Sequence, residues 1–270
     1  MRVSIGDVAL HYEVAGDSGP ALILLHGGPG ADHTLFKPEF SMLADVARVV
    51  YLDQRGSGES DTGSPETWTW SQWADDVLAF RAALEFENPI LVGVSSGGLV
   101  ALTCAARHPD RIGGLILDSP LGAPTSLDET LEVFERRGGP PAREAARRYL
   151  TGDTTDEAQT AWAEHCQPLY GTPSAKPRRV NDDVLTRFRT GGCGPADATT
   201  LLPQITCPTL LLAGEHDPVT PADAARRLAA ALTNAPVTLE IAPDIGHGVF
   251  RQDPERAFAA ARRFLASRPR

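Results

Sequence analysis

The stretch PILVGVSSGG (89–98) decides the fold of this chain. It begins as a short apolar run and passes, at Ser95, into a segment of small residues (96–107) typical of a helix packed tightly on a sheet. The pattern Gly-x-Ser-x-Gly at this junction predicts a strained strand-to-helix turn that projects the serine hydroxyl. Gly93 and Gly97 leave room for so tight a turn. Ser95 is therefore the candidate nucleophile.

Similar apolar runs recur on both sides of this stretch, and such runs predict strands buried on both faces of a parallel sheet. Helical patterns alternate with them, with Ser71 as the predicted N-cap of the first helix and Pro254 at the start of the last. This order predicts an α/β fold with a mostly parallel, doubly wound sheet. The predicted strands are 21–25, 47–52, 89–94, 113–118, 208–214 and 237–242, the predicted helices are 70–84, 96–107, 222–232 and 254–266, and an edge hairpin is predicted at 1–14.

Residues 121–204 interrupt the alternation, because they contain no strong strand run and their apolar residues have helix-like settings. We expect residues 1–120 and 205–270 to form the α/β core and residues 121–204 to form an inserted helical cap. The insertion follows the carboxyl end of a strand, where ligands bind in open α/β sheets, so the cap should lie over the site. A small second domain without a role at the site is the alternative.

A serine nucleophile that attacks a carbonyl needs backbone N–H groups to bind the oxyanion that forms. The segment HGGPG (26–30) directly follows the strand 21–25, in the place from which such a loop supplies one donor. The other donor is the N–H of the residue after the nucleophile. Gly28 and Ser96 are therefore the predicted oxyanion-hole residues.

The acid and the base should follow the serine in the order Ser, Asp, His. Asp217 follows the strand 208–214, and His247 lies between glycines in a loop after the strand 237–242. His247 would accept the proton of Ser95, and Asp217 would hold the imidazole in the required tautomer. Asp118, also at a strand end, is the alternative acid. His33 is expected to pack or to face solvent.

The segment DQRGSGES (53–60) follows another strand and is expected to be scaffolding, with Asp53 and Arg55 fixing the loop by hydrogen bonds. It lacks the lysine of a phosphate-binding loop.

Composition excludes several classes of protein. A net charge of −10 argues against nucleic acid and anionic membranes as partners. The four cysteines are scattered without His clustering, so we expect reduced thiols, no disulfide framework and no metal site. The beginning of the chain lacks a signal-peptide pattern, and no apolar run reaches membrane-spanning length, which favours the cytoplasm. The oligomeric state is left open.

The motifs HGGPG, DQRGSGES, GVSSGG (93–98), GEHDPVTP (214–221) and GHGVF (246–250), in this order, resemble the proline iminopeptidase-like group of the α/β-hydrolase family. The resemblance covers about residues 20–120 and 205–268. It implies the α/β-hydrolase fold, the triad Ser95, Asp217 and His247, the oxyanion donors Gly28 and Ser96, and no cofactor. It also implies release of an N-terminal residue, preferably proline, from short peptides.

The chain departs from the peptidases of this group at two positions near the triad. Ser96 stands where they usually carry an aromatic residue, and Pro218 stands where an acidic residue often binds the substrate's amine. Asp197 matches a second acid of the group, located in the cap. The sequence thus predicts a serine hydrolase of proline iminopeptidase type, acting on a small molecule or short peptide. Hydrolysis of a carboxylic ester or lactone is the alternative, followed by a non-hydrolytic acyltransferase or ligand-binding member.

Overall fold

The computed structural model describes residues 1–123, 125–171 and 179–267. Residue 124 and residues 172–178 of the predicted cap, with residues 268–270 of the predicted core, lie outside the described residues.

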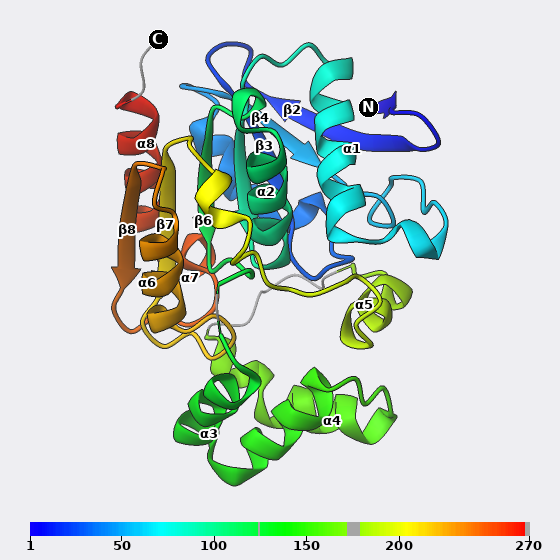
Figure 1. Cartoon of the computed structure of the whole chain (residues 1–270), viewed down its shortest axis with the longest axis vertical. Helices are drawn as coiled ribbons and strands as arrows, with labels where there is room; N and C mark the ends of the chain where they lie inside the picture. Colours follow the sequence, from blue (N-terminus) through cyan, green and yellow to red (C-terminus); the bar gives the residue numbers. More distant parts are fainter. Residues whose placement is uncertain (124, 172–178, 268–270) are drawn as a thin grey trace.

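An eight-stranded sheet forms the centre of the molecule (Figure 1). Its strand order is β1-β2-β4-β3-β5-β6-β7-β8, with β1–β2 and β2–β4 antiparallel and every later pair parallel. The mostly parallel α/β sheet is thus confirmed, as is the hairpin at its edge. The strands are β1 (Arg2–Ser4), β2 (Ala9–Ala15), β3 (Ala21–Leu25), β4 (Arg48–Leu52), β5 (Ile90–Val94), β6 (Gly114–Asp118), β7 (Thr209–Gly214) and β8 (Val237–Ala242).

The central strands are apolar throughout because both of their faces are covered. In β3, Ile23 and Leu25 point into one hydrophobic cluster, whereas Leu22 and Leu24 point into the other. Helices α1 (Trp70–Ala83), α2 (Ser96–Arg107) and α6 (Ala222–Ala231) contribute to the first cluster. Helices α7 (Val249–Gln252) and α8 (Pro254–Ala266) contribute to the second. This alternation within one strand is what a sheet sandwiched between two helical layers requires.

The N-cap of helix α1 lies two residues before the predicted one. Thr69, not Ser71, is the N-cap, and its side chain accepts a hydrogen bond from the N–H of Gln72. Thr69 has the extended backbone of an N-cap, so both hydroxyl residues were compatible with the sequence pattern but only Thr69 stands outside the helix.

The chain between β6 and β7 forms helices in its described part. Its first part packs around a cluster of its own, whereas Val184, in its second part, belongs to the first cluster of the core. Phe134 and Trp162 belong to the segment's own cluster, and Gly139, at φ 74°, marks a kink where two helices join. Figure 1 draws α3 and α4 apart from the sheet, at one of its ends. The helices are α3 (Leu127–Leu150), α4 (Asp156–His165) and α5 (Asp182–Arg189). The short 3-10 helices among the described residues are η1 (His33–Phe36), η2 (Glu39–Leu43), η3 (Pro65–Thr67), η4 (Pro109–Arg111), η5 (Gln167–Tyr170) and η6 (Leu202–Gln204).

Among the described helices, none combines the length and the apolar character needed to cross a membrane.

Candidate active site

Ser95 lies at the turn between β5 and α2 with φ 54° and ψ −119°, a backbone conformation that L-residues rarely adopt. The turn is possible because the residues two positions before and after Ser95 are glycines. A Cβ on Gly93 would lie 2.6 Å from the carbonyl oxygen of Gly97, and a Cβ on Gly97 would lie 2.1 Å from the carbonyl oxygen of Leu25. The strained turn that the sequence pattern predicts is therefore present, and it leaves Ser95 only half-buried.

Asp217 and His247 come together at the ends of the neighbouring strands β7 and β8. The Nδ1 atom of His247 lies 2.8 Å from Oδ2 of Asp217, and the carboxylate is 1% exposed. Burial opposes ionisation of Asp217, but the nearby His247 and hydrogen bonds from Thr220 outweigh it, so the pKa of Asp217 is held below its usual value. An ionised carboxylate thus faces one ring nitrogen of His247, which leaves the other nitrogen for a reacting group.

Asp118, the alternative acid, accepts hydrogen bonds from backbone N–H groups close to His247 and Ser95. Its two carboxylate oxygens accept hydrogen bonds from the N–H groups of Val249 (2.8 Å) and Phe250 (3.1 Å). Its own carbonyl oxygen accepts from the N–H of Ser95 at 3.1 Å. Asp118 therefore joins the turn that carries Ser95 to the loop that carries His247. Burial raises the pKa of its carboxyl, and the two backbone hydrogen bonds oppose that rise.

Ser119 adds a second connection, because its hydroxyl accepts a hydrogen bond from the N–H of Gly248 at 3.0 Å. The sequence gives no indication of this contact, since it joins residues 129 positions apart.

The predicted oxyanion loop lies against Ser95. A Cβ on Gly27 would lie 3.1 Å from Cβ of Ser95 and 3.8 Å from its Oγ. Gly28 follows directly, and Ser96 begins helix α2. The two predicted N–H donors therefore belong to the two segments that meet at Ser95.

His26 and Gln54 fix the beginning of this loop. The Nε2 atom of His26 accepts a hydrogen bond from the N–H of Gln54 at 3.2 Å, and its Nδ1 lies 3.1 Å from the carbonyl oxygen of Gly27. Burial lowers the pKa of His26, in keeping with a neutral ring that accepts at Nε2. The side-chain amide of Gln54 donates to the carbonyl oxygen of His26 at 3.0 Å.

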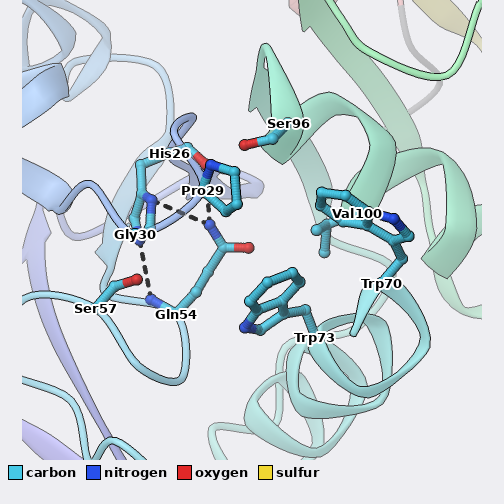
Figure 2. Close-up of a pocket in the computed structure, with 9 residues that line it drawn as sticks. All are labelled: His26, Pro29, Gly30, Gln54, Ser57, Trp70, Trp73, Ser96 and Val100. Atoms are coloured by element: carbon cyan, nitrogen blue, oxygen red, sulfur yellow. Dashed lines mark hydrogen bonds between the residues drawn. The ribbon is translucent and has the colours of Figure 1, made fainter. Parts of the chain in front are cut away.

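A small, partly open hollow lies beside Ser96 and this loop. Figure 2 shows Gln54 with its amide nitrogen toward His26 and its oxygen toward the side of Trp73 and Val100. Since the carbonyl oxygen of His26 can only accept, the nitrogen must face it, and Oε1 of Gln54 is left toward the hollow. The lining residues are His26, Pro29, Gly30, Gln54, Ser57, Trp70, Trp73, Ser96 and Val100.

The segment 53–60 is the scaffolding that the sequence predicts. The carboxylate of Asp53 accepts hydrogen bonds from the N–H groups of His33 (2.7 Å) and Glu59 (2.9 Å). Arg55 is 1% exposed and forms ion pairs with Asp7 and Asp76.

Residues of the inserted segment contact both loops of the site. The carbonyl oxygen of Tyr170 accepts from the N–H of His247 at 2.8 Å, and the two rings meet edge to face. On the other side, the N–H of Asn181 donates to the carbonyl oxygen of Gly30 at 2.8 Å. Asp197 is exposed, and one of its oxygens accepts from the N–H of Thr199 at 2.8 Å.

The chain is similar to several known proteins. A family model described as alpha/beta hydrolase fold matches residues 20–254. RutD of Caulobacter sp. (strain K31), named as a candidate carbamate hydrolase, is 31% identical over 268 residues, which cover 95% of this chain and 96% of that protein. A proline iminopeptidase of Lactobacillus helveticus is 29% identical over 237 residues, covering 78% and 79%. A solved thermophilic esterase from Thermogutta terrifontis is 28% identical with a TM-score of 0.70, and 98% of each chain is covered.

Proposed function

Because the chain belongs to the alpha/beta hydrolase family, we propose that it is a serine hydrolase that forms an acyl-enzyme at Ser95. One observation carries the proposal. Asp217 and His247 form a buried pair at 2.8 Å, and Asp118 ties the loop that carries His247 to the strained turn of Ser95. Acyl transfer needs a nucleophile, a base that accepts its proton, and an acid that orients the base.

In the proposed reaction, Oγ of Ser95 attacks the substrate carbonyl carbon while its proton passes to Nε2 of His247. The N–H groups of Gly28 and Ser96 stabilise the oxyanion, and one such donor is typically worth about 3–4 kcal/mol. Collapse of the intermediate expels the leaving group, which takes the proton from His247. A water molecule then attacks the acyl-enzyme by the same route, so that the acid is released and Ser95 regains its proton.

The inserted segment 121–204 would act as a cap in this reaction. Its contacts through Tyr170 and Asn181 reach the His247 loop and the HGGPG loop. Such contacts would hold both loops in position while the cap limits the access of water.

The hollow favours a small, uncharged acyl group as substrate. The described residues that line it offer two indole rings, Val100 and the oxygen of Gln54, but no carboxylate. A buried ammonium group without a carboxylate would incur a penalty of several kcal/mol. The oxygen of Gln54 could accept from an N–H of a carbamate or amide. We therefore favour a short ester or carbamate over a substrate with a free amine.

A proline iminopeptidase activity is the second candidate, supported by the motifs HGGPG and DQRGSGES and by the Lactobacillus helveticus relative. It would require an acidic group for the substrate's amine. The position of Asp197 does not favour this role, because its carboxylate is exposed and accepts from Thr199.

A fluorophosphonate probe tests the serine chemistry. We expect covalent labelling of one residue, Ser95, as identified by mass spectrometry of the digested protein, because the probe reacts with activated serines. Heat-denatured protein is the control and should remain unlabelled. Labelling at another serine, or none in the folded protein, would contradict the proposal.

A substrate panel separates the two candidates. We expect turnover of short acyl esters such as an acetate, with kcat/KM falling as the acyl chain outgrows the hollow. Proline arylamide should be a poor substrate. Arylamide turnover comparable with that of the acetate ester would overturn our preference and support the aminopeptidase, without affecting the assignment of Ser95.

A further inference from the structure

Two histidines and one glutamate meet in a group that the proposed reaction does not use. His11 and Glu13 are two positions apart on β2 and therefore point to the same face of the sheet. His33 begins η1, the 3-10 helix that follows the HGGPG loop. One ligand atom from each of the three residues lies within 4.8 Å of the others.

The spacing of these atoms suits a small dication. Nε2 of His33 lies 3.1 Å from Oε1 of Glu13, and Nε2 of His11 lies 3.9 Å from the same oxygen. A tetrahedral zinc ion with bonds of about 2.0–2.1 Å separates its ligand atoms by about 3.4 Å. The two separations bracket this value, so small side-chain rotations would suffice.

Each histidine has a carboxylate at its other ring nitrogen. Nδ1 of His33 lies 2.9 Å from Oδ1 of the fully buried Asp53, and Nδ1 of His11 lies 3.4 Å from Oε2 of Glu59. At His11, a proton on Nδ1 that faces Glu59 leaves the lone pair on Nε2. At His33 both ring nitrogens face a carboxylate, and binding of an ion would displace any proton between Nε2 and Glu13. Metal-binding histidines are oriented in this way by their neighbours in proteins.

The observation that points most directly to a bound ion concerns His11. This residue is 8% exposed, and among the described residues no hydrogen-bond partner reaches its buried Nε2. A buried ring nitrogen without a partner calls for an explanation, and a bound ion would supply one.

Local charge also favours a dication. The carboxylates of Glu13, Asp53 and Glu59 contribute three negative charges, against one positive charge from Lys37, which pairs with Oε2 of Glu13. The local sum is −2 when both imidazoles are neutral. Oε2 of Glu13 contacts Lys37, and Oε1 lies toward the histidines.

We propose that His11, Glu13 and His33 bind a divalent transition-metal cation of the zinc class. Two imidazoles and one carboxylate are a frequent ligand set for Zn²⁺, with a water molecule in the fourth position. The ion would tie β2 to η1 and, through Asp53, to the loop that carries Gln54. Its role would be to stabilise the scaffold rather than to take part in the chemistry at Ser95.

The test is titration of the full-length, EDTA-treated protein with ZnCl₂ by calorimetry, and with CoCl₂ by visible absorption. We expect one equivalent of Zn²⁺ per chain, a rise in the thermal midpoint, and the intense absorption of four-coordinate Co²⁺. His11→Ala should weaken Zn²⁺ binding by at least about 10-fold. Glu13→Gln is a second variant, should His11→Ala fail to fold as judged by circular dichroism.

His216→Ala is the matched control. His216 belongs to the exposed group Glu215, His216 and Asp244, the other cluster whose ligand atoms meet among the described residues. We expect this variant to bind Zn²⁺ as the unaltered protein does. The proposal is overturned if the protein binds no Zn²⁺, if His11→Ala and Glu13→Gln both leave the affinity unchanged, or if His216→Ala removes the bound equivalent.

Discussion

Replacing Ser95 with alanine is expected to lower kcat by about 10⁶-fold on any ester that the unaltered protein hydrolyses. The reason is that the acyl-enzyme can no longer form. The remaining reaction is direct attack of water on the substrate, which only the oxyanion donors and substrate binding still assist. Alanine removes one hydroxyl from a half-buried position, so the fold should be preserved. Steady-state kinetics with a short acyl ester, together with circular dichroism and thermal unfolding, measure both effects.

His247→Ala should cost about as much as Ser95→Ala, and the double variant should be scarcely slower than either, because the two residues act as a unit. Ser71→Ala, at an exposed position near the start of α1, is the control and should retain full activity. Additive losses in the double variant would show that the two residues do not act in the same step. Retention of activity within about 10-fold in Ser95→Ala would require another nucleophile.

The sequence was most informative where the determinants are local. The strands 21–25 and 237–242 were predicted with the bounds that the structure has. Residues 21–25 are an uninterrupted apolar run that is covered on both faces, as expected. Residues 237–242 were expected to be covered in the same way, but they form the edge strand of the sheet and are mostly only partly buried. The turn at Ser95 was likewise predictable, since Gly93 and Gly97 are required by contacts within the same turn and with the adjacent strand. The predicted N-cap of α1 was wrong because Thr69 and Ser71 offer the same hydroxyl chemistry.

Features that depend on distant contacts were not predictable in the same way. The position of Asp118 at a strand end made it a candidate acid. Its hydrogen bonds from the N–H groups of Val249 and Phe250 form only in the folded chain. The orientation of Gln54 depends on His26, 28 positions earlier. His33 was expected to pack or to face solvent; it is buried against the ring of His11, and its contact with Glu13 could not be foreseen from the sequence.

Replacing the two aspartates near His247 should have different effects. The Asp217 variant should chiefly lose activity, and the Asp118 variant should chiefly lose stability. Asp217→Asn is expected to lower kcat by about 10⁴-fold, because an amide does not supply the ionised oxygen that Nδ1 of His247 faces. Its Oδ1 could still accept from the N–H groups of Val219 and Thr220, so the loop should keep its conformation. The lowered pKa of Asp217 means that this carboxylate is charged throughout the neutral range, and the loss should therefore persist across it.

Asp118→Asn should act chiefly on stability. One of the two N–H groups that Asp118 accepts would face an amide NH₂ instead, which leaves a buried donor unpaired at a cost of about 1–3 kcal/mol in the free energy of unfolding. The fall in kcat should be smaller than that of Asp217→Asn, since the His247–Asp217 pair is retained. Denaturant unfolding and kcat, measured on both variants, distinguish the roles. If Asp118→Asn proves the more damaging to kcat while Asp217→Asn is nearly unaffected, the orienting acid is Asp118, and the 2.8 Å contact between Asp217 and His247 is not the one used in catalysis.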